Sequence, residues 1–110
     1  MYSVTYKIRL RRGKTLSDFK SWLNAYWVQL KQWGAEAVRA WVLRESGDEF
    51  IFCEYTVQNI RRWNRAAVQN HRSPAIRELE QIAETNRITV LRFPDIPAPP
   101  LDQPMEIHPR

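Results

Sequence analysis

The apolar pattern of this chain predicts more buried sheet surface than one copy of the chain can cover. Four stretches alternate or cluster as β-strands do, and three of the four are apolar on both faces. Only two stretches have the spacing of amphipathic helices. Two helices cover one face of a four-stranded sheet, so the second face needs another cover. A second copy of the chain is the simplest one.

The first strand and the first helix have the clearest local signals. Residues 2–10 alternate strictly between apolar and polar side chains. Thr15 then has the character of a helix N-cap, and Asp18 follows in the first turn, where the helix dipole favours a negative charge. Apolar side chains recur at helical spacing over residues 16–33, and Gly34 is expected to close this helix.

Three further strands and a second helical region complete the expected fold. The strands are predicted at residues 37–44, 49–57 and 87–93. The helical region covers residues 58–84 and breaks near His71, because Ser73 followed by Pro74 is typical of a new helix start. The resulting order βαββαβ predicts a ferredoxin-like α+β fold, with a four-stranded antiparallel sheet and the helices on one side.

Length and proline content divide the chain into a domain and an arm. A chain of 110 residues accommodates one domain, which we expect at residues 1–94. Six of the seven prolines lie between Pro94 and Arg110. Because proline interrupts helices and interior strands, residues 95–110 are predicted to form an extended, proline-rich arm.

The composition favours a cytoplasmic protein and supplies no motif for a cofactor. No apolar run reaches the length of a membrane span, and the first residues contain no apolar signal core. The single Cys53 is interpreted as a small buried hydrophobe. The sequence has no Cys/His spacing typical of a metal site and no glycine-rich phosphate loop. We therefore expect no metal, no cofactor and no membrane partner.

The net charge of +5 comes largely from two basic clusters. The second cluster lies in a stretch without any acidic residue between Tyr55 and Arg77. A basic face can bind nucleic acid, an anionic ligand or nothing specific. We interpret both clusters as solvated faces. Their members are Lys7, Arg9, Arg11, Arg12 and Lys14 in the first cluster and Arg61, Arg62, Arg65, Arg72 and Arg77 in the second.

One acidic residue has a predicted partner inside the sheet. Glu54 shares a strand face with Phe50 and Phe52, so its carboxylate is expected to be partly buried. A buried carboxylate needs a compensating charge. We expect a structural ion pair with Arg39 or Arg92 on a neighbouring strand.

The order of the elements, together with their buried faces, resembles the dimeric α/β-barrel superfamily. Within it, residues 2–94 look most like the antibiotic-biosynthesis monooxygenase-like group. The similarity rests on Arg-Arg-Gly-Lys at residues 11–14, before a helix that contains Asp18-Phe19 and Trp22. It also rests on residues 70–75, which are similar to the His-x-x-Ser-Pro step of that group. The resemblance implies a homodimer in which two sheets form a barrel around a small-molecule site.

The same resemblance suggests which residues form that site. In the cofactor-independent monooxygenases of this superfamily, an Asn and a Trp four residues apart bind an aromatic substrate and stabilise an anionic intermediate. Asn59 and Trp63 have this spacing, which is one helical turn. They become catalytic candidates together with His71, and haem-degrading relatives use a His ligand in the same region. The expected walls of a pocket for a small hydrophobic or aromatic molecule are Tyr6, Trp27, Trp41, Phe50 and Phe52.

Two other functional classes compete with a ligand-binding or catalytic dimer. The aromatic residues can simply fill the interior of a structural or regulatory dimer. The order βαββαβ is also that of RNA-recognition domains, and Phe50, Phe52 and Tyr55 have the spacing of their aromatic motif. However, Asp48 and Glu49 stand where that motif has Lys/Arg-Gly, and their charges repel phosphate. The sequence therefore disfavours nucleic acid as the partner of this sheet.

Overall fold

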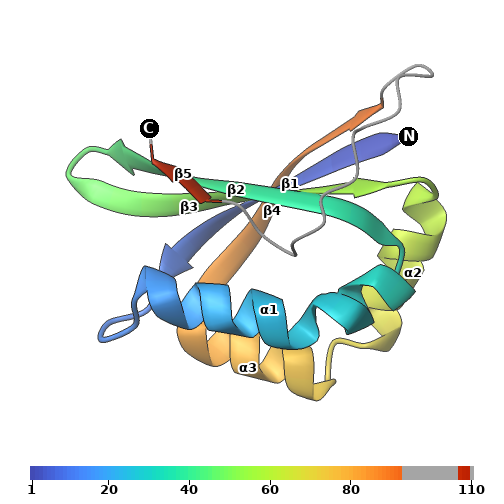
Figure 1. The fold of residues 1–110 in the computed structure, drawn as a ribbon, viewed down its shortest axis with the longest axis horizontal. Coiled ribbons are helices and arrows are strands. Elements are labelled where there is room, and N and C mark those ends of the chain that lie inside the picture. Colours follow the sequence, from blue (N-terminus) through green and yellow to red (C-terminus); the bar gives the residue numbers. More distant parts are fainter. Residues whose placement is uncertain (93–106, 110) are drawn as a thin grey trace.

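The computed structural model describes residues 1–92 and 107–109 of the chain. Four antiparallel strands form a sheet in the order β4-β1-β3-β2, and three helices lie on one side of it (Figure 1). This α+β architecture is compatible with the predicted ferredoxin-like plan. The elements are β1 (Tyr2–Leu10), α1 (Leu16–Gln32), β2 (Ala35–Glu45), β3 (Asp48–Val57), α2 (Ile60–Gln69), α3 (Pro74–Ile82), β4 (Ala83–Arg92) and β5 (Ile107–Pro109).

Local sequence signals account for the helix boundaries. The hydroxyl of Thr15 accepts a hydrogen bond from the Asp18 backbone N–H, and the Asp18 carboxylate accepts one from the Thr15 N–H, so the two residues form a capping box. These hydrogen bonds lower the pKa of Asp18. At the other end, Gly34 follows the C-cap with a φ of 119°, a conformation that favours glycine. The predicted break is confirmed, because Ser73 caps α3 and Pro74 is its first residue.

The hairpin between β2 and β3 is positioned by its turn. Ser46 and Gly47 both have positive φ, at 52° and 84°. This combination matches the right-handed twist of paired strands, which explains why a tight turn forms here. The register that follows pairs Ala40 with Cys53 and Trp41 with Phe52. Apolar side chains of β2 and β3 therefore point to both sides of the sheet, as predicted.

The last predicted strand, residues 87–93, differs most from the structure. β4 begins at Ala83, directly after α3, because residues 83–86 already pair with the end of β1. The register then shifts between Thr5 and Tyr6, which leaves Ile88 as an extra residue in a β-bulge. β4 lies at the edge of the sheet, and Ile88, Val90 and Leu91 are 46%, 40% and 55% exposed. The burial predicted for both faces of this strand is therefore absent from the protomer.

A short parallel strand extends the sheet at its other edge. Residues 107–109 form β5, which pairs with Ala40 to Val42 of β2. Apart from β5, the predicted arm at residues 95–110 covers residues 95–106 and 110, which lie outside the described residues. The proposed boundary at residue 94 falls there as well.

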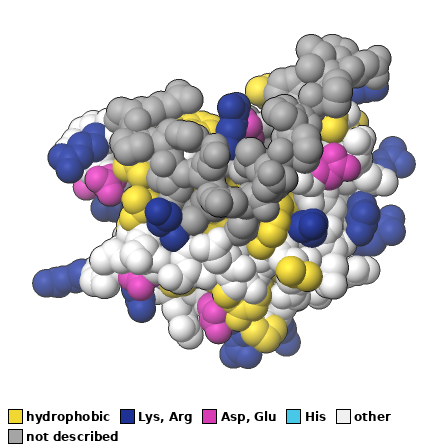
Figure 2. Space-filling model, in the orientation of Figure 1, with side chains coloured by type: hydrophobic (Ala, Val, Ile, Leu, Met, Phe, Trp, Pro, Cys, Tyr) yellow, Lys and Arg dark blue, Asp and Glu magenta, His cyan; other side chains and the backbone are white. Residues whose placement is uncertain are grey.

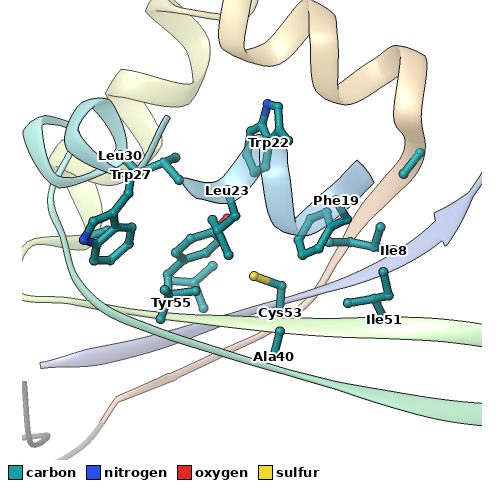
Figure 3. Close-up of a cluster of buried hydrophobic side chains, with 14 of the residues drawn as sticks. Ile8, Phe19, Trp22, Leu23, Trp27, Leu30, Ala40, Ile51, Cys53 and Tyr55 are labelled. Atoms are coloured by element: carbon teal, nitrogen blue, oxygen red, sulfur yellow. The ribbon is translucent and has the colours of Figure 1, made fainter. Parts of the chain in front are cut away.

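The hydrophobic core fills the space between α1 and the sheet. Figure 3 shows Phe19 and Leu23 of α1 pointing toward strand residues such as Cys53. Leu23 and Cys53 are both completely inaccessible to solvent. Trp22 also donates a hydrogen bond from Nε1 to the carbonyl of Ala75 at 2.8 Å, which ties α1 to α3. The longest helix, α1, has 17 residues, and no helix in the described ranges has the length and hydropathy of a membrane span.

The side of the sheet away from the helices, called the outer face below, mixes aromatic and charged side chains. The rings of Trp41 and Phe52 stack with centroids 6.1 Å apart and planes inclined by 10°. The Lys7 ammonium lies 4.1 Å from the centre of the Phe50 ring. Glu54 accepts a hydrogen bond from Arg39 at 2.7 Å, which confirms the ion pair predicted for this carboxylate.

Candidate ligand-binding cavity

A cavity of about 600 Å³ lies between the helices and the sheet. This volume is typical of pockets that bind drug-sized molecules, which measure about 300–1,000 Å³. Side chains from all three helices and from β1, β3 and β4 contribute to its wall. Most of the wall is apolar, and its aromatic members are Tyr6, Phe19, Trp22, Trp33, Tyr55 and Trp63.

Three of these aromatic residues hold one another in place. Trp63 donates a hydrogen bond from Nε1 to the Tyr6 hydroxyl at 2.9 Å. The Tyr55 ring packs edge-on against Tyr6 at 5.8 Å between centroids and in a tilted arrangement against Trp63 at 5.2 Å. Because the indole N–H is only a donor, the Tyr6 oxygen is the acceptor, and its own proton can be donated to a third group.

Burial determines the protonation state of this tyrosine. It raises the pKa of Tyr6 above its ordinary value, although the Trp63 hydrogen bond and the Arg87 charge act in the opposite direction. Burial also raises the pKa of Tyr55. Both phenols are therefore neutral near pH 7, and Tyr6 is a hydrogen-bond donor to the cavity rather than a nucleophilic phenolate.

His71 contributes the complementary group. It lies in the turn between α2 and α3 and belongs to the cavity wall. Its Nδ1 is 2.8 Å from the carbonyl oxygen of Val68. A carbonyl only accepts hydrogen bonds, so we assign the proton to Nδ1, which leaves the Nε2 lone pair as an acceptor or base. The cavity thus combines a neutral phenol donor with an imidazole acceptor.

Paired charges form the part of the wall near the β1–α1 turn. Arg11 donates a hydrogen bond from Nε to the carbonyl oxygen of Glu80, and its Nη1 lies 3.5 Å from the Glu84 carboxylate. Both acidic residues and Arg11 line the cavity. Since this arginine has protein partners, the polar contacts of a ligand fall to other wall residues, among them Tyr6, His71, Thr85 and Asn86.

The structure brings three of the predicted site residues together and separates Asn59 from them. Tyr6, Trp63 and His71 all line the cavity. Asn59 is exposed, and its side-chain oxygen accepts a hydrogen bond from the Arg62 backbone N–H at 3.0 Å. It is the N-cap of α2, with extended backbone angles of −120° and 103°. The Asn59 side chain therefore serves as the cap of α2 and does not line the cavity.

The other predicted wall residues lie elsewhere in the molecule. Trp27 of α1 is buried in the hydrophobic core and does not line the cavity (Figure 3). Trp41, Phe50 and Phe52 point to the outer face of the sheet, because they alternate with core residues such as Ile51. Side chains on opposite faces of one sheet cannot line the same cavity.

Several wall residues were not among the sequence-based candidates. Phe19, Trp22 and Trp33 belong to the aromatic stripe of α1, and this stripe was an available signal. Thr85 and Asn86 also line the cavity, but the sequence carried no comparable signal for them, because they fall between the helical region predicted to end at residue 84 and the strand predicted from residue 87.

Neither a metal site nor a known family helps to identify a ligand for this cavity. Among the residues described, no group of three or more His, Cys, Asp or Glu side chains could hold a metal ion. Comparison of the sequence with protein-family models and with curated proteins found no match.

Proposed function

We propose that the chain binds a small aromatic molecule with a polar substituent in the cavity between the helices and the sheet. The observation that carries this proposal is an aromatic cavity of about 600 Å³ with a fixed polar donor in its wall, the Tyr6 hydroxyl held by Trp63. Flat aromatic ligands bury their faces against such walls, while a few fixed polar groups set their orientation.

A phenol or a quinone fits the polar groups of the wall. The Tyr6 proton can be donated to a ligand oxygen, and His71 Nε2 can accept a proton or hydrogen bond from a ligand hydroxyl. Oxygenation of such a ligand, the activity implied by the resemblance to the antibiotic-biosynthesis monooxygenase-like group, is not part of the proposal. Asn59 lies outside the cavity wall and already caps α2.

Two substitutions test the ligand site with naphthol, a bicyclic phenol, as the probe. Ala67 lines the cavity, so Ala67→Phe should fill part of the space and abolish naphthol binding in calorimetry. Tyr6→Phe should weaken binding about 2–10-fold, since one hydrogen bond contributes about 0.5–1.5 kcal/mol. Tyr26→Phe is the matched control, because Tyr26 lies outside the cavity wall. Equal affinity in the wild type and Ala67→Phe would show that the cavity is not the site.

We further propose that two copies of the chain associate through their outer faces. This proposal is supported by the half-buried apolar side chains Trp41, Leu43 and Phe50, which share the outer face. Covering a large apolar side chain contributes about 1.5–3 kcal/mol, so several of them on one face favour an interface.

A charge introduced at the outer face should prevent this association. The wild type is expected to sediment at twice the chain mass of 13.1 kDa, and Leu43→Glu at the mass of one chain. The physical reason is the desolvation of an unpaired carboxylate within an apolar contact. Val28→Glu on α1 is the matched control, because Val28 is 68% exposed on the opposite side of the molecule. A monomeric wild type at micromolar concentration would refute the dimer.

A further inference from the structure

The outward side of α2 and the turn after it carry a row of arginines without nearby acids. The row consists of Arg61, Arg65 and Arg72, all of them exposed. No acidic residue occurs between Tyr55 and Arg77, so nothing along this stretch offsets their charge. The row is therefore a local excess of positive charge on this side of the molecule.

Helical spacing places these side chains together. Trp63 and Ala66 form the buried side of α2, which leaves Arg61 and Arg65 one turn apart on the opposite side. Val68 lies on the same side of α2 and is 72% exposed. Arg72 follows in the turn after α2. Figure 2 shows basic side chains gathered at the right-hand end of the molecule, where Figure 1 places α2.

These arginines have no side-chain partner among the described residues. Within residues 1–92, Arg61, Arg65 and Arg72 make no ion pair and no side-chain hydrogen bond. Their neighbour Arg62, by contrast, donates a hydrogen bond to the carbonyl of Gln32 at the end of α1. The ion pairs elsewhere are Lys7–Glu45, Arg11–Glu84, Arg39–Glu54 and Arg44–Glu49.

The position of Arg61 is also unfavourable for the helix. It lies in the first turn of α2, which contains no acidic residue. The amide dipoles of a helix make its N-terminus positive, so this end favours acids and disfavours arginine. Helix stability therefore does not explain Arg61, whereas binding of an anion does.

We propose that this arginine row binds the phosphate backbone of a nucleic acid. Three exposed guanidinium groups along α2 and the following turn suit an extended polyanion, because arginine forms paired hydrogen bonds with phosphate. None of the three lines the ligand cavity. A membrane-binding helix needs a broad apolar side, and this row contains only Val68. The site is independent of the ligand cavity.

The double variant Arg61→Gln/Arg65→Gln tests the row on fluorescently labelled single-stranded DNA and RNA. Removing two phosphate contacts should reduce the slope of log affinity against log salt by about 1.4. Affinity at low salt should fall about tenfold for each arginine. Lys14→Gln/Lys20→Gln is the matched control, since it removes the same charge from exposed positions at the other end of α1.

A third variant separates loss of binding from loss of folding. Arg61→Glu should weaken binding further by repelling phosphate, while it raises the melting temperature because the carboxylate favours the N-terminus of α2. A protein that is more stable and binds less nucleic acid would support the proposal directly.

Three outcomes would overturn the proposal. Equal weakening by both double variants would indicate a general effect of net charge rather than the row. If the wild type shows no detectable binding to either oligonucleotide at low salt, nucleic acid is excluded as the ligand of the row. Salt-sensitive binding to phosphatidylserine vesicles without binding to either oligonucleotide would assign the row to a lipid surface.

Discussion

Replacing Leu23 with alanine is expected to lower the free energy of unfolding by about 2–5 kcal/mol. Leu23 lies on the sheet-facing side of α1, completely inaccessible to solvent, among Phe19, Tyr55 and Cys53 (Figure 3). It does not line the ligand cavity, so the space left behind would be a new void in the core. Total stabilities of natural proteins are about 5–15 kcal/mol, so this single change removes a large fraction.

Denaturant titration at a fixed protein concentration measures this loss, because association of two chains would otherwise shift the midpoint. Val28→Ala is the matched control on the same helix, since Val28 is 68% exposed and its truncation should change stability by less than about 0.5 kcal/mol. Thermal melting should show a drop of at least about 10 °C for Leu23→Ala. Similar stabilities of the two variants would show that α1 is not packed on the sheet as described.

The sequence predicted most of the fold because most of its signals are local. Strict alternation in residues 2–10 is sufficient to define β1, and Ser46 and Gly47, both with positive φ, form the turn between the strands predicted at residues 37–44 and 49–57. The capping box of Thr15 and Asp18 and the break before Pro74 depend on neighbours within one helical turn. Such features do not require knowledge of the tertiary structure.

β4 could not be predicted in the same way. Residues 83–86 are polar apart from Ala83 and extend the helical region in sequence, yet they pair with β1. The bulge at Ile88 forms because β4 pairs with β1 in one register before this residue and in another register after it. Only the assembled sheet determines these registers. The cavity residues Thr85 and Asn86 consequently had no detectable signal.

The candidate site was only partly predictable for a related reason. Trp63 and His71 were selected through a family pattern, and both line the cavity with Tyr6. The partner chosen by spacing, Asn59, lies one residue before the helix begins, where helical geometry no longer applies. Trp41 was chosen for its aromatic character, but the parity of β2 places it on the outer face.

Cys53 is expected to be at least about a thousandfold less reactive toward iodoacetamide in the folded protein than in the unfolded chain at pH 8. Burial raises the pKa of its thiol from 9.0 to about 12, and the side chain has no solvent exposure. Only the thiolate is alkylated, and three pKa units reduce its population about a thousandfold. Time-resolved labelling with and without guanidinium chloride, followed by mass spectrometry, measures the ratio.

The same shift predicts how stability changes in alkali. The pKa of Cys53 is higher in the folded state, so the folded protein binds the proton more tightly, and this contribution is complete below pH 9. Above pH 9 the unfolded thiol ionises first, and stability should fall by about 1.4 kcal/mol per pH unit until about pH 12. Cys53→Ala should show a shallower decline, with Tyr6 and Tyr55 accounting for the remainder. Identical alkaline slopes in the two proteins, or rapid labelling of the folded wild type, would mean that the thiol reaches solvent and that α1 does not close this part of the core.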